Sequence, residues 1–213
     1  FHSDKLDRYD RKSEAEFLNL VRKTREGLNA YGPENLRGQE LLSWKIGAWL
    51  MDDMIRKMSF AHSSYRVNQI GGIMINTPQF LTDGHRIINE KSMDRYIARL
   101  HEFARVIEEV KVRIMNDRDN GVVPPDFVIN GALRGMRSFI DGGLNENPLF
   151  SSLPRRLGKL DTITEARKQE LVGQAGHVIA AEIIPRYVGM IELFVSLLPL
   201  SDPHAGIWRI PQG

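Results

Sequence analysis

Hydrophobic residues recur at helical spacing through most of this 213-residue chain. The clearest example precedes Asn120-Gly121, where steps of four and three place six apolar side chains on one face: Tyr96, Leu100, Phe103, Ile107, Val110 and Ile114. Glycine accepts the left-handed conformation that commonly ends a helix, so Gly121 marks a C-terminal stop. The pattern predicts a long helix with one buried face.

Two helices are predicted before this one. The first begins near Ser13, because Ser13 and Glu16 have capping-box spacing. The second spans about Gly38–Met58 and carries an apolar stripe: Leu42, Ile46, Trp49, Leu50 and Met54. From Ser59 to Glu90 the periodicity fails. An irregular segment of this length inside a compact domain is often functional.

Two further helices are predicted after it. One spans about 124–141 and opens on two prolines, which suit a first turn because their missing N–H has no helical partner there. The other runs from the capping pair Thr162 and Glu165 to about residue 198, and Pro185 should kink it. The connections are polar but not linker-like. The sequence therefore predicts a single all-α domain over residues 1–213, an irregular multi-helix bundle with a long kinked C-terminal helix.

Composition excludes several classes of function. The formal net charge of +2 and the absence of a single-sign block give no reason to expect nucleic acid as a partner. Without cysteine the chain has no disulfide, thiol nucleophile or cysteine zinc site. The most apolar run, Gly189–Leu200, contains Glu192 and Pro199 and is shorter than the roughly 20 residues that cross a bilayer. No transmembrane segment is expected.

Motif searching finds no complete catalytic or metal site. His101-Glu102-Phe103-Ala104-Arg105 begins like a zincin helix, which needs two histidines four positions apart to reach one metal. Arg105 stands where the second histidine belongs, and a guanidinium does not ligate zinc. No serine lies in a nucleophile elbow, and Gly71-Gly72 lacks dinucleotide or P-loop spacing. We therefore expect neither a catalytic residue nor a metal ligand within this chain, and interpret 101–105 as a solvated helix face.

Several segments, in this order and spacing, resemble the N-terminal half of the bacterial domain of unknown function 885 (DUF885) family. They are Asn68-Gln69-Ile70-Gly71-Gly72, Asp94-Arg95-Tyr96-Ile97-Ala98-Arg99-Leu100, Gly121-Val122-Val123-Pro124-Pro125, Ile184-Pro185 and Gly206-Ile207-Trp208-Arg209-Ile210-Pro211-Gln212-Gly213. The resemblance covers about Phe17 to the end of the chain.

The resemblance implies a helical zinc metallopeptidase whose His-Glu metal signature lies on a later helix. This chain is then the truncated part of a larger helical zincin-like fold. Zinc is expected in the intact protein but not in this chain, and the missing C-terminal half is an expected partner. Many proteins of this kind carry export or lipoprotein signals, which implies a soluble protein in the periplasm or associated with the cell envelope.

Three hypotheses for function follow. In the first, the chain is the N-terminal helical portion of a zinc-dependent peptidase or related hydrolase acting on a peptide or small molecule. The alternative is a noncatalytic helical binding or scaffold module whose irregular segment 59–90 binds a partner. The third is a noncatalytic relative whose later half has lost its metal.

Candidate substrate-lining residues come from two of the resembling segments. The C-terminal segment combines glycines with a short β-prone stretch, and an extended segment can hold a peptide by backbone pairing. We therefore expect Gly206, Trp208 and Gly213 to line the substrate cleft, unless Trp208 instead fills a gap in the helical core. Asn68 and Gln69 complete the predicted set.

Overall fold

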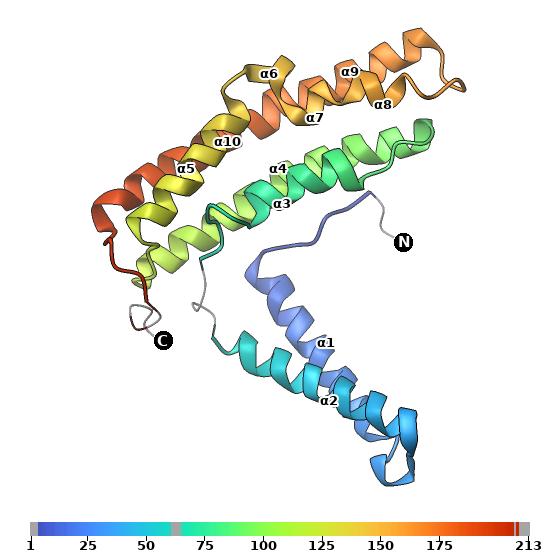
Figure 1. Cartoon of the computed structure of the whole chain (residues 1–213), viewed down its shortest axis with the longest axis vertical. Coiled ribbons are helices and arrows are strands. Elements are labelled where there is room, and N and C mark those ends of the chain that lie inside the picture. Colours follow the sequence, from blue (N-terminus) through green and yellow to red (C-terminus); the bar gives the residue numbers. More distant parts are fainter. Residues whose placement is uncertain (1–3, 61–64, 207, 209–213) are drawn as a thin grey trace.

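The computed structural model describes residues 4–60, 65–206 and 208, and helices account for the regular structure in these ranges (Figure 1). The α-helices are α1 (Arg11–Asn29), α2 (Gly38–Met58), α3 (Ile73–Gln79), α4 (Glu90–Asp119), α5 (Asp126–Ile140), α6 (Gly143–Glu146), α7 (Pro148–Ser151), α8 (Leu153–Leu157), α9 (Glu165–Val178) and α10 (Ile184–Leu197). Single turns are the 3-10 helices η1 (Pro33–Asn35) and η4 (Leu198–Leu200) and the π-helices η2 (Phe80–Gly84) and η3 (Ile179–Ile183). The predicted all-α class is confirmed.

The helices form a bundle and a projecting hairpin. In the bundle α4 packs against α3, α9 and α10, and α10 also packs against α5. α1 and α2 pack on each other as an antiparallel hairpin that extends away from the bundle (Figure 1). The chain before α1, residues 4–10, runs along α4; we call it the strap. In its described residues, the irregular segment predicted between α2 and α4 contains the short helix α3 and the π-helical turn η2.

The core confirms the predicted face of α4. All six apolar side chains of that face are buried, with exposed fractions between 0 and 6%. Phe103 meets the ring of Tyr187 edge to face, and Tyr187 stacks on Phe139. The hydroxyl groups of these buried tyrosines have acceptors: Tyr96 donates to the Leu149 carbonyl and Tyr187 to the Met74 carbonyl, both at 2.8 Å. Both of these buried tyrosine hydroxyls are therefore paired. The contacts of α4 with α3, α9 and α10 make it the central helix of the bundle.

Two helix starts differ from the sequence prediction. The N-cap of α1 is Asp10, whose side chain accepts from the Ser13 amide at 2.9 Å. The N-cap of α9 is Thr164, whose hydroxyl accepts from the Arg167 amide. Aspartate and threonine are both strong N-caps. The capping boxes predicted at Ser13 and Thr162 were therefore wrong by two or three residues.

α9, η3, α10 and η4 form one continuous helix, Glu165–Leu200. The disturbance expected at Pro185 takes the form of the π-helical turn η3 directly before it. There the Ile184 amide donates to the Ile179 carbonyl, a wider turn than in an α-helix. Proline has no amide hydrogen to donate one turn back, and a π-turn is a common way to accommodate such a gap.

By length and composition this helix could cross a membrane, which the sequence run Gly189–Leu200 alone did not indicate. The same test is passed by core helices of soluble proteins. Here Leu171, Ile179, Tyr187 and Phe194 are buried in the bundle core. This single helix is weak evidence for a membrane span.

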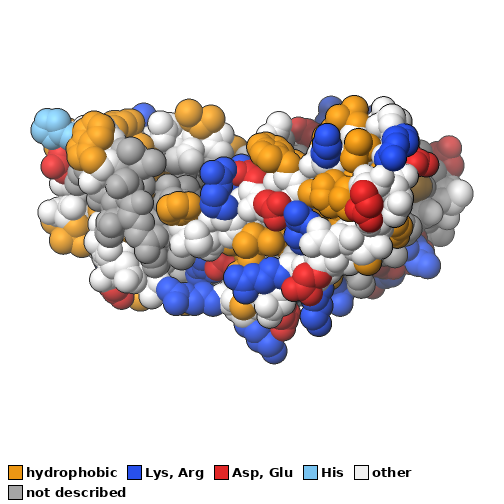
Figure 2. Space-filling view, turned by 90° about the horizontal axis from the view of Figure 1, so that it is seen from below, with side chains coloured by type: hydrophobic (Ala, Val, Ile, Leu, Met, Phe, Trp, Pro, Cys, Tyr) orange, Lys and Arg blue, Asp and Glu red, His pale blue; other side chains and the backbone are white. Residues whose placement is uncertain are grey.

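Charged side chains of both signs are mixed on the surface in the described part of the chain. On the face shown in Figure 2, Lys and Arg side chains alternate with Asp and Glu side chains, and hydrophobic side chains reach the surface between them. This mixture agrees with the small net charge of the sequence.

Candidate functional site

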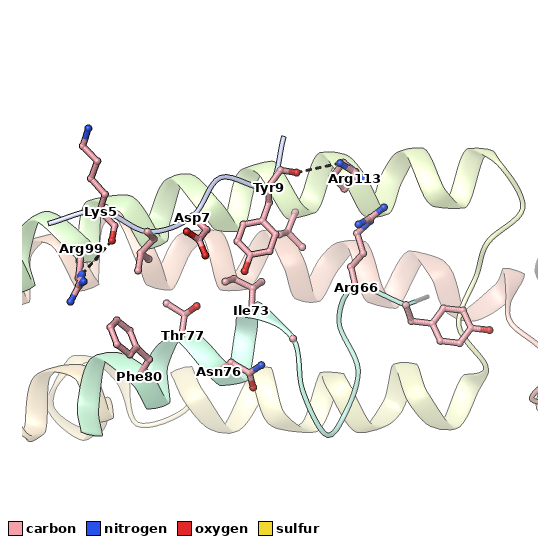
Figure 3. A pocket seen from close by; sticks show the side chains of 14 residues that line it. Lys5, Asp7, Tyr9, Arg66, Ile73, Asn76, Thr77, Phe80, Arg99 and Arg113 are labelled. Carbon is pink, nitrogen blue, oxygen red and sulfur yellow. Dashed lines mark hydrogen bonds between the residues drawn. The ribbon is translucent and has the colours of Figure 1, made fainter. Parts of the chain in front are cut away.

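A cavity of about 700 Å³ lies between the strap, the segment 65–80 and α4, and we call it the main cavity (Figure 3). The strap contributes Lys5, Asp7 and Tyr9 to its wall, and α3 contributes Asn76 and Thr77. Three arginines complete the polar lining: Arg66, Arg99 and Arg113. A cavity of this size with a few convergent polar groups is the ordinary form of a small-molecule site.

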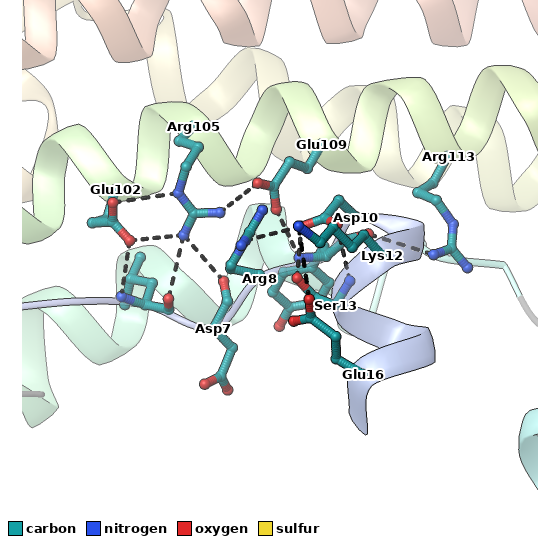
Figure 4. A network of polar contacts seen from close by, with 12 residues as sticks. Asp7, Arg8, Asp10, Lys12, Ser13, Glu16, Glu102, Arg105, Glu109 and Arg113 are labelled. Carbon is teal, nitrogen blue, oxygen red and sulfur yellow. Dashed lines mark hydrogen bonds and ion pairs between the residues drawn. The ribbon is translucent and has the colours of Figure 1, made fainter. Parts of the chain in front are cut away.

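The strap is held in place by Arg105 of α4 (Figure 4). Its guanidinium donates to Glu102 at 2.7 Å and Glu109 at 2.6 Å, and to the backbone carbonyls of Leu6 and Asp7, both at 3.3 Å. The two carboxylates in turn accept from strap amides, Glu109 from Tyr9 at 2.7 Å. The hydrogen bond from Arg105 lowers the pKa of Glu102, so this carboxylate is ionised at neutral pH.

Residues 101–105, which begin like a zincin helix, therefore make structural contacts. Glu102 and Arg105 fasten the strap, and His101 faces away from them to form a contact of 2.8 Å with Glu182. In the described part of the chain, no group of three His, Cys, Asp or Glu residues is arranged to hold a metal ion.

A tight turn before α3 sets the floor of the cavity. The Asn68 side chain accepts from the amides of Ile70 and Gly71, both at 2.9 Å, and Val67 bridges to Gly72. Gly72 has φ 98° and ψ 176°, a conformation that is almost exclusive to glycine. A Cβ at this position would lie 2.6 Å from the Arg66 carbonyl oxygen. The turn brings Arg66 into the wall of the cavity.

The charges of the cavity differ in how they are paired. Arg66 contacts Asp117 at 2.7 Å, and Arg113 contacts Glu14 at 2.8 Å. Arg99 instead donates to the Lys5 carbonyl at 3.3 Å and lies over the Phe80 ring. Among the described residues no carboxylate lies within ion-pair distance of Arg99, and none of their cations pairs with the Asp7 side chain. Burial lowers the pKa of Arg99, and the nearby negative charge of Asp4 opposes this shift. One guanidinium and one carboxylate thus remain for a ligand.

Arg99 is hydrogen-bonded to the buried side chain of His85. Its ring is buried, with Nδ1 2.7 Å from Nη1 of Arg99 and Nε2 2.9 Å from the Ser92 carbonyl. Because a guanidinium only donates, we assign the neutral tautomer in which Nδ1 accepts and Nε2 donates. Burial, and then the positive charges of Arg99, Arg156 and Arg95, lower the pKa of His85. Neutral His85 therefore orients Arg99 toward the cavity.

This arrangement predicts a dependence of stability on pH. The folded-state pKa of His85 lies below its ordinary 6.5, so the unfolded chain binds more protons and stability falls as pH drops below about 6.5. Glutamine can accept and donate similarly without titrating. We expect the His85→Gln variant to lose less unfolding free energy than the parent between about pH 7.5 and 5.5. Urea melts at each pH measure this, and parallel losses in the two proteins would contradict the assignment.

The residues predicted from sequence lie elsewhere. Asn68 and Gln69 line a separate, more open cavity of about 440 Å³ with Tyr65 and Val128. Gln69 packs closely on Gly131 of α5. A Cβ added at Gly131 would lie 2.5 Å from the Cβ of Gln69. On either side of this pair, Arg66 and Gly72–Ile73 line the main cavity, and Tyr65 lines both cavities.

The C-terminal candidates Gly206 and Trp208 do not line the main cavity either. Trp208 is 73% exposed in this structure and its ring lies close to Gly206. Gly213 lies outside the described residues. A substrate role for these residues stays a prediction. Sequence reasoning missed Asp7, His85 and Arg99; only Arg99 carried a signal, as part of the resembling segment Asp94–Leu100.

Comparisons with known proteins agree with this fold. A family model described as "Bacterial protein of unknown function (DUF885)" matches residues 1–212. A crystal structure described as that of "the putative lipoprotein from Colwellia psychrerythraea" superimposes with a TM-score of 0.86 at 21% identity. The match covers 99% of this chain and 37% of that one, so this chain spans little more than a third of the length of that protein. At this identity the likeness shows the fold alone. No curated protein matches this chain.

Proposed function

Because the chain belongs to the bacterial DUF885 family, we propose that it is the N-terminal helical portion of a zinc-dependent peptidase or related hydrolase of the cell envelope. In this proposal the chain supplies substrate contacts, and the metal ligands come from polypeptide outside this sequence. The cell-envelope location is supported by the description of the similar crystal structure as a lipoprotein, and we place the intact protein in the periplasm.

The observation that carries the proposal is the cavity with an available guanidinium, Arg99, and an available carboxylate, Asp7. Asp7 points into the space between the strap and α3, and Arg99 lies at one end of that space beside Phe80 (Figure 3). A short peptide is a zwitterion, with an ammonium group at one end and a carboxylate at the other. The cavity offers each end a partner of opposite charge, and guanidinium is well suited to carboxylate.

Variants of Arg99 test this assignment. We expect Arg99→Gln to weaken binding of an unmodified dipeptide such as Ala-Ala about 10- to 100-fold, because a hydrogen bond to a charged group contributes about 1.5–3 kcal/mol. The same variant should not change the affinity for the C-terminal amide of that peptide. Isothermal titration calorimetry measures both. Arg134→Gln, an exposed position on α5 that does not line the cavity, is the matched control.

A variant of Asp7 tests recognition of the ammonium end of the peptide. Asp7→Asn should weaken the unmodified dipeptide and leave the N-acetylated dipeptide unchanged, because acetylation removes the ammonium group that Asp7 would meet. If neither variant alters dipeptide affinity while both remain folded, the cavity does not bind peptide termini.

A noncatalytic binding module is the second candidate. It is favoured by the fact that the strap, α3 and α4 form the cavity within this chain, without further polypeptide. The two candidates differ in the intact gene product: a peptidase should contain about one zinc per chain and lose turnover on chelation, whereas a binding module should bind the dipeptide without hydrolysing it. The same zinc measurement distinguishes a peptidase from a noncatalytic relative whose later half has lost its metal, because that relative should contain no zinc.

A further inference from the structure

α2 is apolar on two opposite faces. One face packs on α1: Ala48 is buried, the Trp44 indole donates to the Leu28 carbonyl at 2.9 Å, and the Leu28 side chain lies over Gly47. At 100° per residue, the stripe predicted from sequence points the other way. Its members are 43–64% exposed: Leu42, Ile46, Trp49, Leu50 and Met54. We call these residues the outer stripe.

A helix with apolar residues on both sides is typical of a protein interior. Here α1 covers one side, and in the described residues the other side is open to solvent. The one acid near the outer stripe, Asp53, is only 11% exposed and is neutralised by Arg56 at 2.7 Å and Lys57 at 2.6 Å. Both cations lower the pKa of Asp53 through hydrogen bonds, Lys57 most strongly. At 100° per residue Asp53 falls between Ile46 and Trp49, and its pairing provides partners for this carboxylate within the stripe.

We propose that the outer stripe is an internal interface, covered in the intact protein by an amphipathic helix from a part of the same polypeptide outside this sequence. The proposal rests on the proposed function, in which the chain is one portion of a longer protein. It is supported by the similar crystal structure, in which most of the chain lies outside the matched region.

The dimensions of the stripe suit one helix. From Leu42 to Met54 it extends about 18 Å, or little more than three helical turns. Ridges of large side chains such as Ile46 and Trp49 pack into the grooves of a second helix at interaxial distances of about 8–10 Å. A covering helix on the same polypeptide benefits from an effective concentration in the millimolar range, which a separate molecule lacks.

Single-cysteine labelling tests the interface, because residues 1–213 contain no cysteine. Ile46→Cys and Leu42→Cys place thiols on the outer stripe, and two positions guard against one variant failing to fold. Lys23→Cys is the control, since Lys23 is exposed and lies on the polar side of α1. Each variant is made in the intact gene product and in the 1–213 chain, and maleimide addition is followed by mass spectrometry of the peptide that contains the new cysteine.

We expect both stripe thiols to react at least about tenfold more slowly than the control in the intact protein, because a covered position must open before it reacts. In the dilute 1–213 chain, stripe and control thiols should react at similar rates. Urea should abolish the difference in the intact protein.

Other outcomes overturn the proposal. Equal rates in the folded intact protein mean that the stripe is uncovered. Protection that grows with protein concentration, with a doubled mass in sedimentation, assigns the stripe to a second copy, and protection that needs phospholipid vesicles assigns it to a membrane. A gene that encodes no polypeptide beyond these residues also excludes it. Zinc content and peptidase activity are measured on the same preparation, so a protected but metal-free protein refutes the proposed function alone.

Discussion

Replacing Phe103 with alanine is expected to lower the free energy of unfolding by about 3–5 kcal/mol. Phe103 has no exposed surface and lies in the centre of α4, where its ring meets Tyr187 edge to face. Removing the ring loses its transfer free energy and leaves a cavity that the surrounding helices can fill only in part. Urea denaturation followed by circular dichroism measures the loss.

His101→Ala is the matched control for Phe103 on the same helix. The His101 side chain is 53% exposed, and its contact with Glu182 is a surface pair worth at most about 1 kcal/mol. Losses of similar size in the two variants would mean that the buried and exposed faces of α4 have been assigned wrongly.

Replacing Gly72 with alanine is expected to destabilise the protein by at least about 1–3 kcal/mol. The backbone at Gly72 has φ 98° and ψ 176°, which an L-residue rarely adopts, and the new Cβ would lie 2.6 Å from the carbonyl oxygen of Arg66. Relief of this contact must move the turn that carries Arg66. We therefore also expect weaker dipeptide binding in the folded fraction of this variant, as measured by calorimetry.

Gly135→Ala is the control for Gly72→Ala, and it should raise rather than lower the free energy of unfolding. Gly135 lies within α5, and a Cβ there would meet no atom within 4 Å. Alanine in an open helix interior stabilises by about 0.5–1 kcal/mol relative to glycine. Destabilisation of equal size in both variants would show that the turn at Gly72 is not strained by a side chain.

The pairing of Arg99 with His85 connects the pH prediction to the binding prediction. A protonated His85 would carry a positive charge 2.7 Å from Arg99 and could no longer accept its hydrogen bond. Dipeptide affinity should therefore fall as pH drops through the folded-state pKa of His85, which lies below 6.5, and so at lower pH than the onset of the stability loss. The fall should be smaller in His85→Gln.

Local sequence determined the long helices of this protein, whereas the short helix α3 was not predicted. The buried face of α4 and the boundaries of α2 follow from a period close to 3.6 and from nearby stop residues, and these depend on a few neighbouring positions. The starts of α1 and α9 were missed by two or three residues because several side chains there compete to cap the same amides.

The tertiary structure alone decided the cavity and the role of the outer stripe. Arg105 binds carbonyls nearly a hundred residues earlier, and Arg99 meets His85 from the loop before α4, so no spacing in the sequence brings these groups together. Periodicity identified the apolar stripe of α2 but not which surface of the helix α1 would cover. The hydrophobic pattern of a sequence identifies the side chains whose burial is favourable. Which segment buries them depends on packing between residues that are distant in the sequence.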